Sequence, residues 1–508
     1  MLGRLAADPL ARQSAFSAVA TFVPQLVGLL TIPLLVSRLG DAAYGVWALV
    51  GTFIVVFMTL DGGISASAQR FYSLYAATGR GDLAARLTVT LMGAVTAFAA
   101  LIWALGPWIA GGVLAVTDVP IRYHEDAITL FRHLGLLVGL LLLANVAMGQ
   151  LRAQGRFGRV ALAVALSQSA FVAALVWFGT SLTLANMLTV AIVQLGTLAG
   201  CLIAGMGGHL LTLRPRLTGR DQWGEFFGYA NRSLVTNLSS LAFLQAGPLF
   251  VASFAPIEQV GQYSVAAMLA SAIRSLPMFV ITPLLNTLTE AFARGGRERM
   301  VRLGNRINAL WTPGCLGLVL LAATGLWFVV RGFTGETSIT PAVAILLTLG
   351  NGFNLSTGIT TACCRAVGLP GLEARYSVVL TLGILITTAP AALLSGAIGV
   401  AVANLVVQVV ALAYFARVLR RGLPGLSLGW GHVRWLTMVV SAAAVMVLCL
   451  PSLALPPRSM VTLLAAGAAV AAGAALYAVL NRRAFRDFRA DGPAVMPRPA
   501  PHEDPRRL

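Results

Sequence analysis

The chain has 508 residues, of which 58% are hydrophobic and 11% are charged, and its mean hydropathy is +0.83. A water-soluble globule of this size could not bury so much apolar surface, so the composition excludes a soluble enzyme and indicates a protein of the lipid bilayer. The net charge of +18 comes from 36 basic residues, all arginine, which are spread over many short segments without adjacent stacking aromatics, a pattern that argues against nucleic-acid binding.

Apolar stretches long enough to cross a bilayer follow one another along most of the chain. A hydrocarbon core about 30 Å thick needs roughly 20 helical residues, and about fourteen stretches reach this length. We therefore predict an all-α, polytopic membrane protein. The predicted spans are 14–36, 43–66, 87–112, 127–150, 159–179, 184–206, 225–252, 260–289, 307–330, 339–363, 376–395, 397–418, 432–451 and 459–480.

The arginines predict the orientation of these spans. About 29 of them fall in every second gap between spans, and basic loops stay in the cytoplasm. The opposite side holds only a few, of which Arg38 is the first. Both termini are therefore expected on the cytoplasmic side of a bacterial cytoplasmic (inner) membrane, which requires an even number of spans.

An internal repeat predicts how the spans are grouped. Pro33 lies shortly before Gly45, and Pro248 lies at a similar distance before Gly261, so the two segments align at an offset of about 215 residues. Six spans separate the copies, which keeps both in the same orientation, the plan of transporters with two parallel lobes. The predicted domains are an N-lobe at 1–206, a C-lobe at 207–421, two additional spans at 422–480 and a disordered basic cytoplasmic tail at 481–508.

Prolines interrupt spans at corresponding places in the two halves. Pro33, Pro248 and Pro277 lie in spans 1, 7 and 8, and such interruptions point to the binding site and the moving helices of a transporter. The alternative is that prolines are simply more frequent in membrane helices than in soluble ones.

Two arginines lie inside spans and not beside them. Arg274 is near the middle of span 8, where an arginine costs roughly 2.5–3.5 kcal/mol on an insertion scale, so it is the first candidate for a ligand-binding residue. Arg232 lies only about one to two turns into span 7, where its side chain can reach the cytoplasmic headgroups, and is the second candidate.

Neutral polar side chains accompany these arginines. Asn237 and Gln245 in span 7, Gln262 in span 8 and Gln25 in span 1 are candidate hydrogen-bonding groups for a sugar. They could instead join helices to one another, which is at least as common. Asp61, near the cytoplasmic end of span 2, is either an ion-coupling acid or the partner of a nearby arginine.

The sequence contains no signature of a catalytic, metal or cofactor site. The five cysteines lie in or at the edge of apolar spans, and the five histidines are scattered without ligand spacing. A phosphate-binding loop and a nucleophile elbow are both missing from the sequence. We therefore expect neither an enzyme nor a protein with a metal or other cofactor.

The first spans resemble a known family. Arg38-Leu-Gly-Asp-Ala-Ala-Tyr-Gly45, followed by Asp61, Gly63 and Arg70, is similar to the opening of the polysaccharide-transporter (O-antigen-flippase-like) family of the multidrug/oligosaccharidyl-lipid/polysaccharide exporter superfamily. The similarity covers about residues 14–420 in topology, but its specific residues lie mainly in the first 160.

The resemblance implies a fold of two six-helix lobes, shared with multidrug-and-toxin extrusion (MATE) transporters and peptidoglycan-precursor flippases. It also implies a substrate, an undecaprenyl-diphosphate-linked oligosaccharide moved from the inner to the outer leaflet, with membrane lipids and polysaccharide-assembly proteins as partners. Arginines in the spans favour this anion over a cationic drug. The alternatives are a multidrug/cation antiporter of the same fold and a non-transporting scaffold of a glycan-assembly complex.

Overall fold

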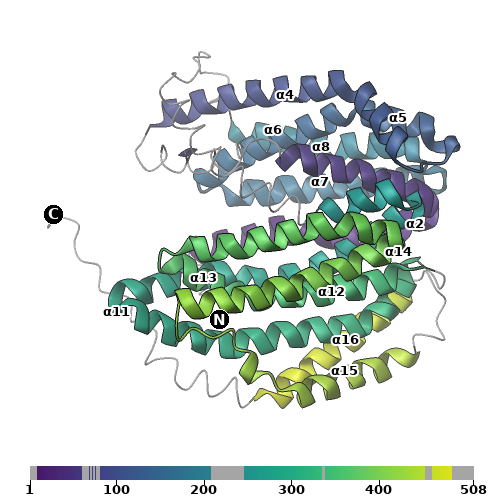
Figure 1. The fold of residues 1–508 in the computed structure, drawn as a ribbon. Coiled ribbons are helices and arrows are strands. Elements are labelled where there is room, and N and C mark those ends of the chain that lie inside the picture. The colour runs from purple at the N-terminus through teal and green to yellow at the C-terminus, as the bar shows by residue number, and fades with distance from the viewer. Residues whose placement is uncertain are drawn as a thin grey trace. The chain divides into compact units, whose positions relative to one another are not determined.

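The structure, a computed structural model, is built from long α-helices (Figure 1). It describes residues 9–59, 68, 71–72, 75, 80–207, 245–334, 338–451 and 460–482. In these ranges every regular element is a helix and no strand occurs, so the predicted all-α fold class is confirmed.

Most described helices follow the predicted spans, but the predicted span 127–150 is divided at His133 and the predicted span 339–363 at Thr357. The N-terminal elements are α2 (Pro9–Thr59), α4 (Gly81–Val116), η1 (Ile121–Tyr123), α5 (His124–Arg132), α6 (Leu134–Ala153), α7 (Phe157–Phe178), η2 (Gly179–Ser181) and α8 (Leu184–Met206). The later elements are α11 (Ile257–Thr334), α12 (Thr340–Ser356), α13 (Gly358–Ala366), α14 (Pro370–Gly422), η3 (Trp430–His432), α15 (Trp435–Cys449) and α16 (Met460–Leu480).

Three of these helices each contain two predicted spans. Non-helical dihedral angles divide α2 at Gly40, α11 at Gly295 and Gly296, and α14 at Ser395 and Gly396. Gly40, Gly296 and Gly396 have positive φ angles of 77°, 64° and 57°, which glycine adopts without the steric penalty of a Cβ. Glycine thus lets the chain reverse between consecutive spans within one or two residues.

The helices have the length and composition of membrane spans. Eight of the described helices are long and apolar enough to cross a bilayer, and α15 and the segment Leu464–Leu480 are shorter apolar helices. The chain is therefore a multi-pass membrane protein. The predicted span 225–252 is described only from Gln245 onward, and the predicted tail lies outside the described residues apart from Asn481 and Arg482.

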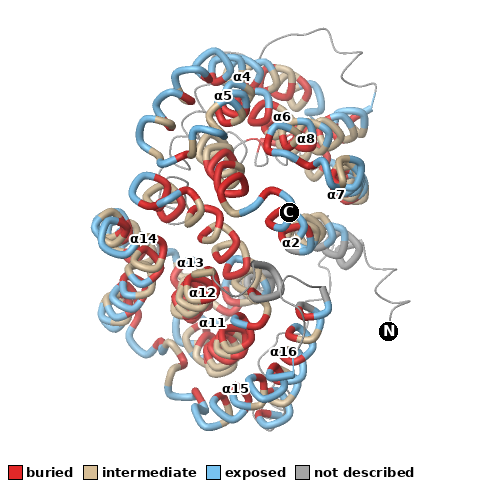
Figure 2. The backbone as a smooth tube through the Cα atoms, turned by 90° about the vertical axis from the view of Figure 1, so that its right-hand side faces the viewer, coloured by how far each residue is buried: buried red, intermediate tan, exposed pale blue. Residues whose placement is uncertain are grey.

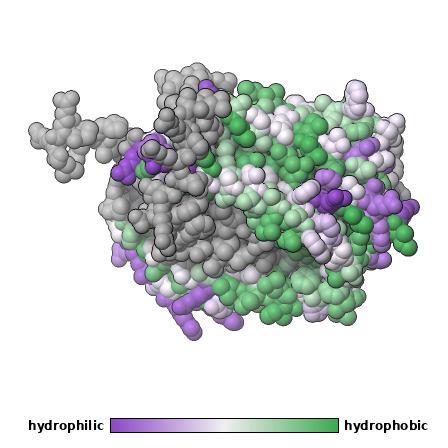
Figure 3. Space-filling model, turned by 90° about the horizontal axis from the view of Figure 1, so that it is seen from above, coloured by the Kyte–Doolittle hydropathy of each residue, from purple (hydrophilic) through white to green (hydrophobic). Residues whose placement is uncertain are grey.

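Large apolar side chains face outward along the helices. Trp177 of α7 is 86% exposed, Leu394 of α14 is 85% exposed and Leu436 of α15 is 78% exposed. The exposed stretches of these helices are visible in Figure 2, and apolar residues cover much of the described surface in Figure 3. Such surfaces are stable in lipid and would promote aggregation in water.

The chain forms two compact units. Unit 1 comprises Met1–Val265 and Ile384–Val400, and unit 2 comprises Ala266–Gly383 and Ala401–Leu508. These two units are defined by the contacts between residues. The predicted lobes rest instead on the sequence repeat, and they stay a prediction.

Small residues let the helices of unit 1 approach one another. A Cβ at Gly135 of α6 would collide with the backbone of Trp103 in α4, and a Cβ at Gly139 would lie 2.7 Å from the Ala99 side chain. Close backbone approach of this kind is the usual basis of helix packing in membranes, where water does not drive association.

In unit 2 the two C-terminal helices pack on the second half of α11 (Figure 1). Leu321 and Phe328 of α11 join Val445 of α15 and Ala469 of α16 in one buried cluster. The Tyr477 hydroxyl of α16 donates a hydrogen bond to the Pro313 carbonyl at 3.0 Å. The additional helices are therefore an integral part of this unit.

Candidate functional site

A line of polar side chains runs along α12 and α13 in unit 2. Asn351, Asn354, Thr357, Thr361 and Arg365 recur every three or four residues, so they share one face of the nearly continuous helix pair. From the first to the last they span about 21 Å at 1.5 Å per residue. We call these five residues the polar stripe. It extends over most of the thickness of a hydrocarbon core of about 30 Å.

Arg274 lies beside this stripe. The Asn351 side-chain amide donates a hydrogen bond at 3.2 Å to the carbonyl of Ala270 in α11, and Arg274 follows one helical turn later on the same face. Arg274 is half-buried, and its guanidinium lies close enough to Tyr376 of α14 for the two groups to interact electrostatically. Arg274 is thereby placed among groups from α11, α12 and α14.

Tyr376 is the residue that joins these helices. Its hydroxyl accepts a hydrogen bond from the Asn354 side-chain amide at 2.9 Å and also bonds the Thr357 side chain. Its ring is 4% exposed and lies 5.0 Å from the ring of Phe415. The phenol is therefore held in place by packing as well as by hydrogen bonds.

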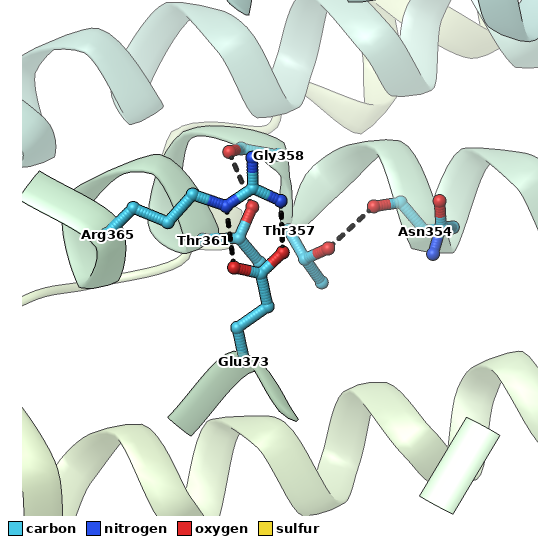
Figure 4. Close-up of polar contacts among 6 residues, drawn as sticks. All are labelled: Asn354, Thr357, Gly358, Thr361, Arg365 and Glu373. Atoms are coloured by element: carbon cyan, nitrogen blue, oxygen red, sulfur yellow. Dashed lines mark hydrogen bonds and ion pairs between the residues drawn. The ribbon is translucent and has the colours of Figure 1, made fainter. Parts of the chain in front are cut away.

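An ion pair closes the end of the stripe at the turn from α13 to α14 (Figure 4). Arg365 donates two hydrogen bonds to Glu373, one from Nε to Oε2 at 2.7 Å and one from a terminal nitrogen to Oε1. Glu373 is in the first turn of α14, where the helix dipole favours a carboxylate. The pair thus occupies a position that suits both partners.

The arrangement combines positive charge with neutral hydrogen-bonding groups. Two arginines flank amides, hydroxyls and a phenol, and the carboxylate of Glu373 is already engaged by Arg365. Among the described residues no group of three or more histidines, cysteines, aspartates or glutamates could hold a metal ion. Chemically, such a site suits an anion with attached hydroxyl groups.

A second polar contact lies in unit 1 and involves the predicted residue Gln262. Its side-chain amide in α11 donates to the Asp41 carboxylate, just after the break in α2, at 3.3 Å. Beside it, a Cβ on Gly45 would collide with the carbonyl oxygen of Ile257, and a Cβ on Gly261 would lie 3.1 Å from the Gly45 nitrogen. The two glycines aligned by the repeat therefore lie against each other.

A neighbouring contact fixes the break in α14. The backbone N–H of Ala397 donates to the side-chain oxygen of Gln259 at 3.0 Å, and Gly396 leaves the space that this side chain fills. In unit 1 the start of α11 thus contacts the breaks of two other helices.

Five of the predicted site residues fall in segments that the structure does not describe. Arg232, Asn237, Asp61, Gly63 and Arg70 lie outside the described residues.

Those that are described keep their predicted place in helices. Gln25 and Pro33 are half-buried in the first half of α2, where Arg38 is exposed. Gln245 begins the helical segment that contains the buried Pro248, and Pro277 is half-buried in α11.

The stripe itself was not predicted. Asn354, Glu373 and Tyr376 are not among the candidate residues, and Arg365 is one of the arginines whose alternation predicts the orientation of the spans. The spacing of Asn351, Asn354 and Thr357 in an apolar span is the signal that could have found it.

Comparison with known proteins gives the fold a context. No family model and no curated protein matches the sequence. Among solved structures, a lipid II flippase MurJ in an inward closed conformation superposes with a TM-score of 0.68 at 13% identity, over 93% of this chain and 100% of the other. An inward-facing multidrug resistance MATE transporter of the MOP superfamily superposes with a TM-score of 0.58 at 15% identity, over 78% of this chain and 99% of the other.

The chain has the fold of MOP-superfamily transporters. A third structure with this fold is a MOP-superfamily transporter from Pyrococcus furiosus, described as having a binding pocket of reverse polarity and a different function. Its TM-score is 0.50 at 17% identity, over 81% of this chain and 96% of the other.

Proposed function

We propose that the protein is a flippase that moves an undecaprenyl-diphosphate-linked oligosaccharide from the inner to the outer leaflet of a bacterial cytoplasmic membrane by alternating access. The observation that carries the proposal is the position of Arg274 beside the polar stripe. A diphosphate requires a positive group, and an arginine fork matches its oxygens. The hydroxyl groups of a glycan require neutral donors and acceptors such as Asn354 and Thr357.

In this mechanism Arg274 binds the diphosphate, polar side chains bind the first sugars, and the polyprenyl tail remains in the hydrocarbon. Arg232, Asn237, Gln245, Gln262 and Gln25 are proposed as further substrate contacts. Because the cell interior is negative, the membrane potential favours outward movement of two negative charges by roughly 4–5 kcal/mol per 100 mV. The membrane potential would then drive export without a separate coupling ion.

The fold shared with MATE transporters makes drug or cation antiport the second candidate. A cationic substrate requires a free carboxylate, and the one at the stripe is held by two hydrogen bonds from Arg365. Antiport therefore predicts efflux-dependent drug resistance, whereas the flippase predicts a defect in surface polysaccharide.

The decisive variant is Arg274→Ala, assayed for surface polysaccharide in cells with equal amounts of protein. We expect export to fall by about tenfold or more, because a hydrogen bond to a charged group contributes roughly 1.5–3 kcal/mol. Arg274→Lys keeps the positive charge but loses the planar guanidinium that can donate two parallel hydrogen bonds, and we expect intermediate export.

Arg302→Ala provides the matched control. Arg302 is also on α11, but its side chain is 73% exposed and pairs with Glu298 at 3.6 Å. Its removal changes the net charge equally and should leave export unchanged. Normal export by Arg274→Ala, with Arg302→Ala also normal, would contradict the role of Arg274 and favour a scaffold.

A further inference from the structure

The ion pair between Arg365 and Glu373 differs in geometry from two other ion pairs among the described residues. Arg86 with Asp82, at 3.9 Å, and Arg302 with Glu298, at 3.6 Å, join neighbouring turns of one helix through single contacts. Arg365 instead uses two nitrogens of its guanidinium on both oxygens of Glu373 and joins α13 to α14. This fork geometry is the one in which arginine binds a phosphate group.

The exposures of the two partners differ in a way that leaves Arg365 accessible. The Arg365 side chain is 53% exposed, and that of Glu373 is 20% exposed. A ligand can therefore approach the guanidinium from solvent while the carboxylate lies against the protein. Arg365 is thus the accessible partner of the pair, and an anion that binds its guanidinium takes the place of the Glu373 carboxylate.

Arg365 is continuous with the site proposed around Arg274. Glu373 and Tyr376 are three residues apart on α14 and so share a face, and Tyr376 bonds Asn354 of the polar stripe. Arg365 ends this same stripe, about 16 Å of helix rise beyond Asn354. A lipid-linked substrate that enters along the stripe from the α13 end would meet Arg365 before Arg274.

We infer that Glu373 occupies the place of a phosphate on Arg365 in the unloaded protein, and that the diphosphate of the substrate displaces it. The inference rests on the proposed function and adds an entry site to it. It also gives loading a structural consequence, because the exchange of anions releases the tie between α13 and α14. Arg365 is thereby a further substrate-binding residue, and the Glu373 carboxylate competes with the substrate for it.

The test uses Glu373→Gln in the purified full-length chain, which keeps the shape of the side chain and removes its charge. Two probes are titrated by calorimetry, inorganic pyrophosphate and farnesyl diphosphate. We expect Glu373→Gln to bind both about fivefold more tightly than the unmodified chain, because the competing anion is gone. In an Arg365→Ala background the same change should have no effect on binding.

Glu298→Gln is the control, since it removes the carboxylate of an exposed ion pair on α11 and should leave both affinities unchanged. Equal or weaker binding of farnesyl diphosphate by Glu373→Gln, with an unchanged thermal midpoint, would show that the pair is only a structural tie and overturn the inference. Binding of pyrophosphate without farnesyl diphosphate would also overturn it, because the site would then serve free phosphate compounds.

The two proposals fail in different ways. If Arg274→Ala abolishes binding of farnesyl diphosphate while Glu373→Gln leaves it unchanged, the entry site is wrong and the proposed function stands. If the Glu373 and Arg365 variants behave as expected while export of polysaccharide is normal in Arg274→Ala, the anion site stands and the proposed function is wrong.

Discussion

Tyr376 bonds the polar stripe through its hydroxyl and lies close enough to Arg274 for the two groups to interact electrostatically. Its hydroxyl receives the amide hydrogen of Asn354 and bonds Thr357, and the charge of Arg274 acts on the same phenol. The neighbouring ring of Phe415 limits its movement. Removing only the hydroxyl should therefore affect binding and stability together.

We expect Tyr376→Phe to lower the free energy of unfolding by about 1–3 kcal/mol, because the amide of Asn354 loses its acceptor in a site with little access to water. The measurement is the thermal midpoint of the purified protein in detergent. Affinity for farnesyl diphosphate should fall in the same variant, since the Tyr376 hydroxyl would no longer hold the side chain of Asn354 in place near Arg274.

Tyr123→Phe is a suitable comparison, because Tyr123 is half-buried at the end of η1 and far in sequence from the stripe. It should shift neither quantity. Equal midpoints for Tyr376→Phe and the unmodified chain would show that the hydroxyl of Tyr376 is not part of a stabilising network.

At the scale of single residues, Arg274 can be predicted from the sequence as a candidate binding residue, but the residues around it cannot. Arg274 is recognisable because a charge inside an apolar span is costly wherever the helix lies. Tyr376 and Glu373 have no such local signal, since about a hundred residues separate them from Arg274 and only the packing of α14 brings them near. Arg365 is conspicuous in the sequence as a charged residue at the end of an apolar span, but the alternation of arginines that predicts the topology already accounts for it.

At the scale of helices, a contact between glycines joins α2 to the start of α11. Gly45 and Gly261 lie so close that a Cβ on Gly261 would be 3.2 Å from the Gly45 Cα. The hydrogen bond from Gln262 to Asp41 lies beside them. Since both glycines have helical neighbours on either side, their absence of a side chain serves close packing and not a turn.

We expect Gly45→Ala to destabilise the protein by about 1–3 kcal/mol, because the new Cβ would collide with the Ile257 carbonyl oxygen and the helices would have to move apart. Thermal unfolding of the purified protein measures the loss.

Gly51→Ala is the matched control in the same helix, since a Cβ at Gly51 would meet no other atom within 4 Å. It should be neutral or slightly stabilising, as alanine is the better helix former. A midpoint for Gly45→Ala equal to that of Gly51→Ala would contradict this account of the contact.

A second correspondence links helices of the two halves. Thr88 of α4 donates to Gln150 of α6 at 3.1 Å, and Asn308 of α11 donates to Thr360 of α13 at 3.1 Å. All four side chains are buried. Thr88 and Asn308 are 220 residues apart, and Gln150 and Thr360 are 210 residues apart. The two pairs thus join helices that the predicted repeat makes equivalent, but at positions that the repeat does not align, and the two lobes stay a prediction.

The spans could be predicted from sequence because apolar length is a local property, and the three breaks fell between predicted spans for the same reason. What could not be predicted is which faces of the helices meet. Membrane interfaces depend on small residues such as Gly135 and Gly325, and a sequence with 52 glycines gives no means of choosing among them.

At the scale of the whole molecule, the arginine alternation predicts which side of the membrane each turn faces. The break of α2 should face away from the cytoplasm, and the break of α11 should face the cytoplasm. Arg38 and Arg302 are exposed residues near these two breaks. Their accessibility from outside the cell therefore tests the orientation.

We expect Arg38→Cys to react in intact cells with a maleimide that does not cross membranes, and Arg302→Cys to react only after the membrane is opened. The unsubstituted chain controls for its own five cysteines, of which four are buried and Cys201 is partly exposed. Labelling of Arg302→Cys in intact cells would contradict the predicted topology, because it would place the break of α11 outside the cell.

The contact between Gly45 and Gly261 has a consequence for how the chain can vary. In a protein made of two identical half-length subunits, the two aligned glycines would be encoded by one codon, so any mutation there would place two side chains in the same space at once. In the single chain the two glycines are separate positions, and a substitution at one adds only one side chain to the contact.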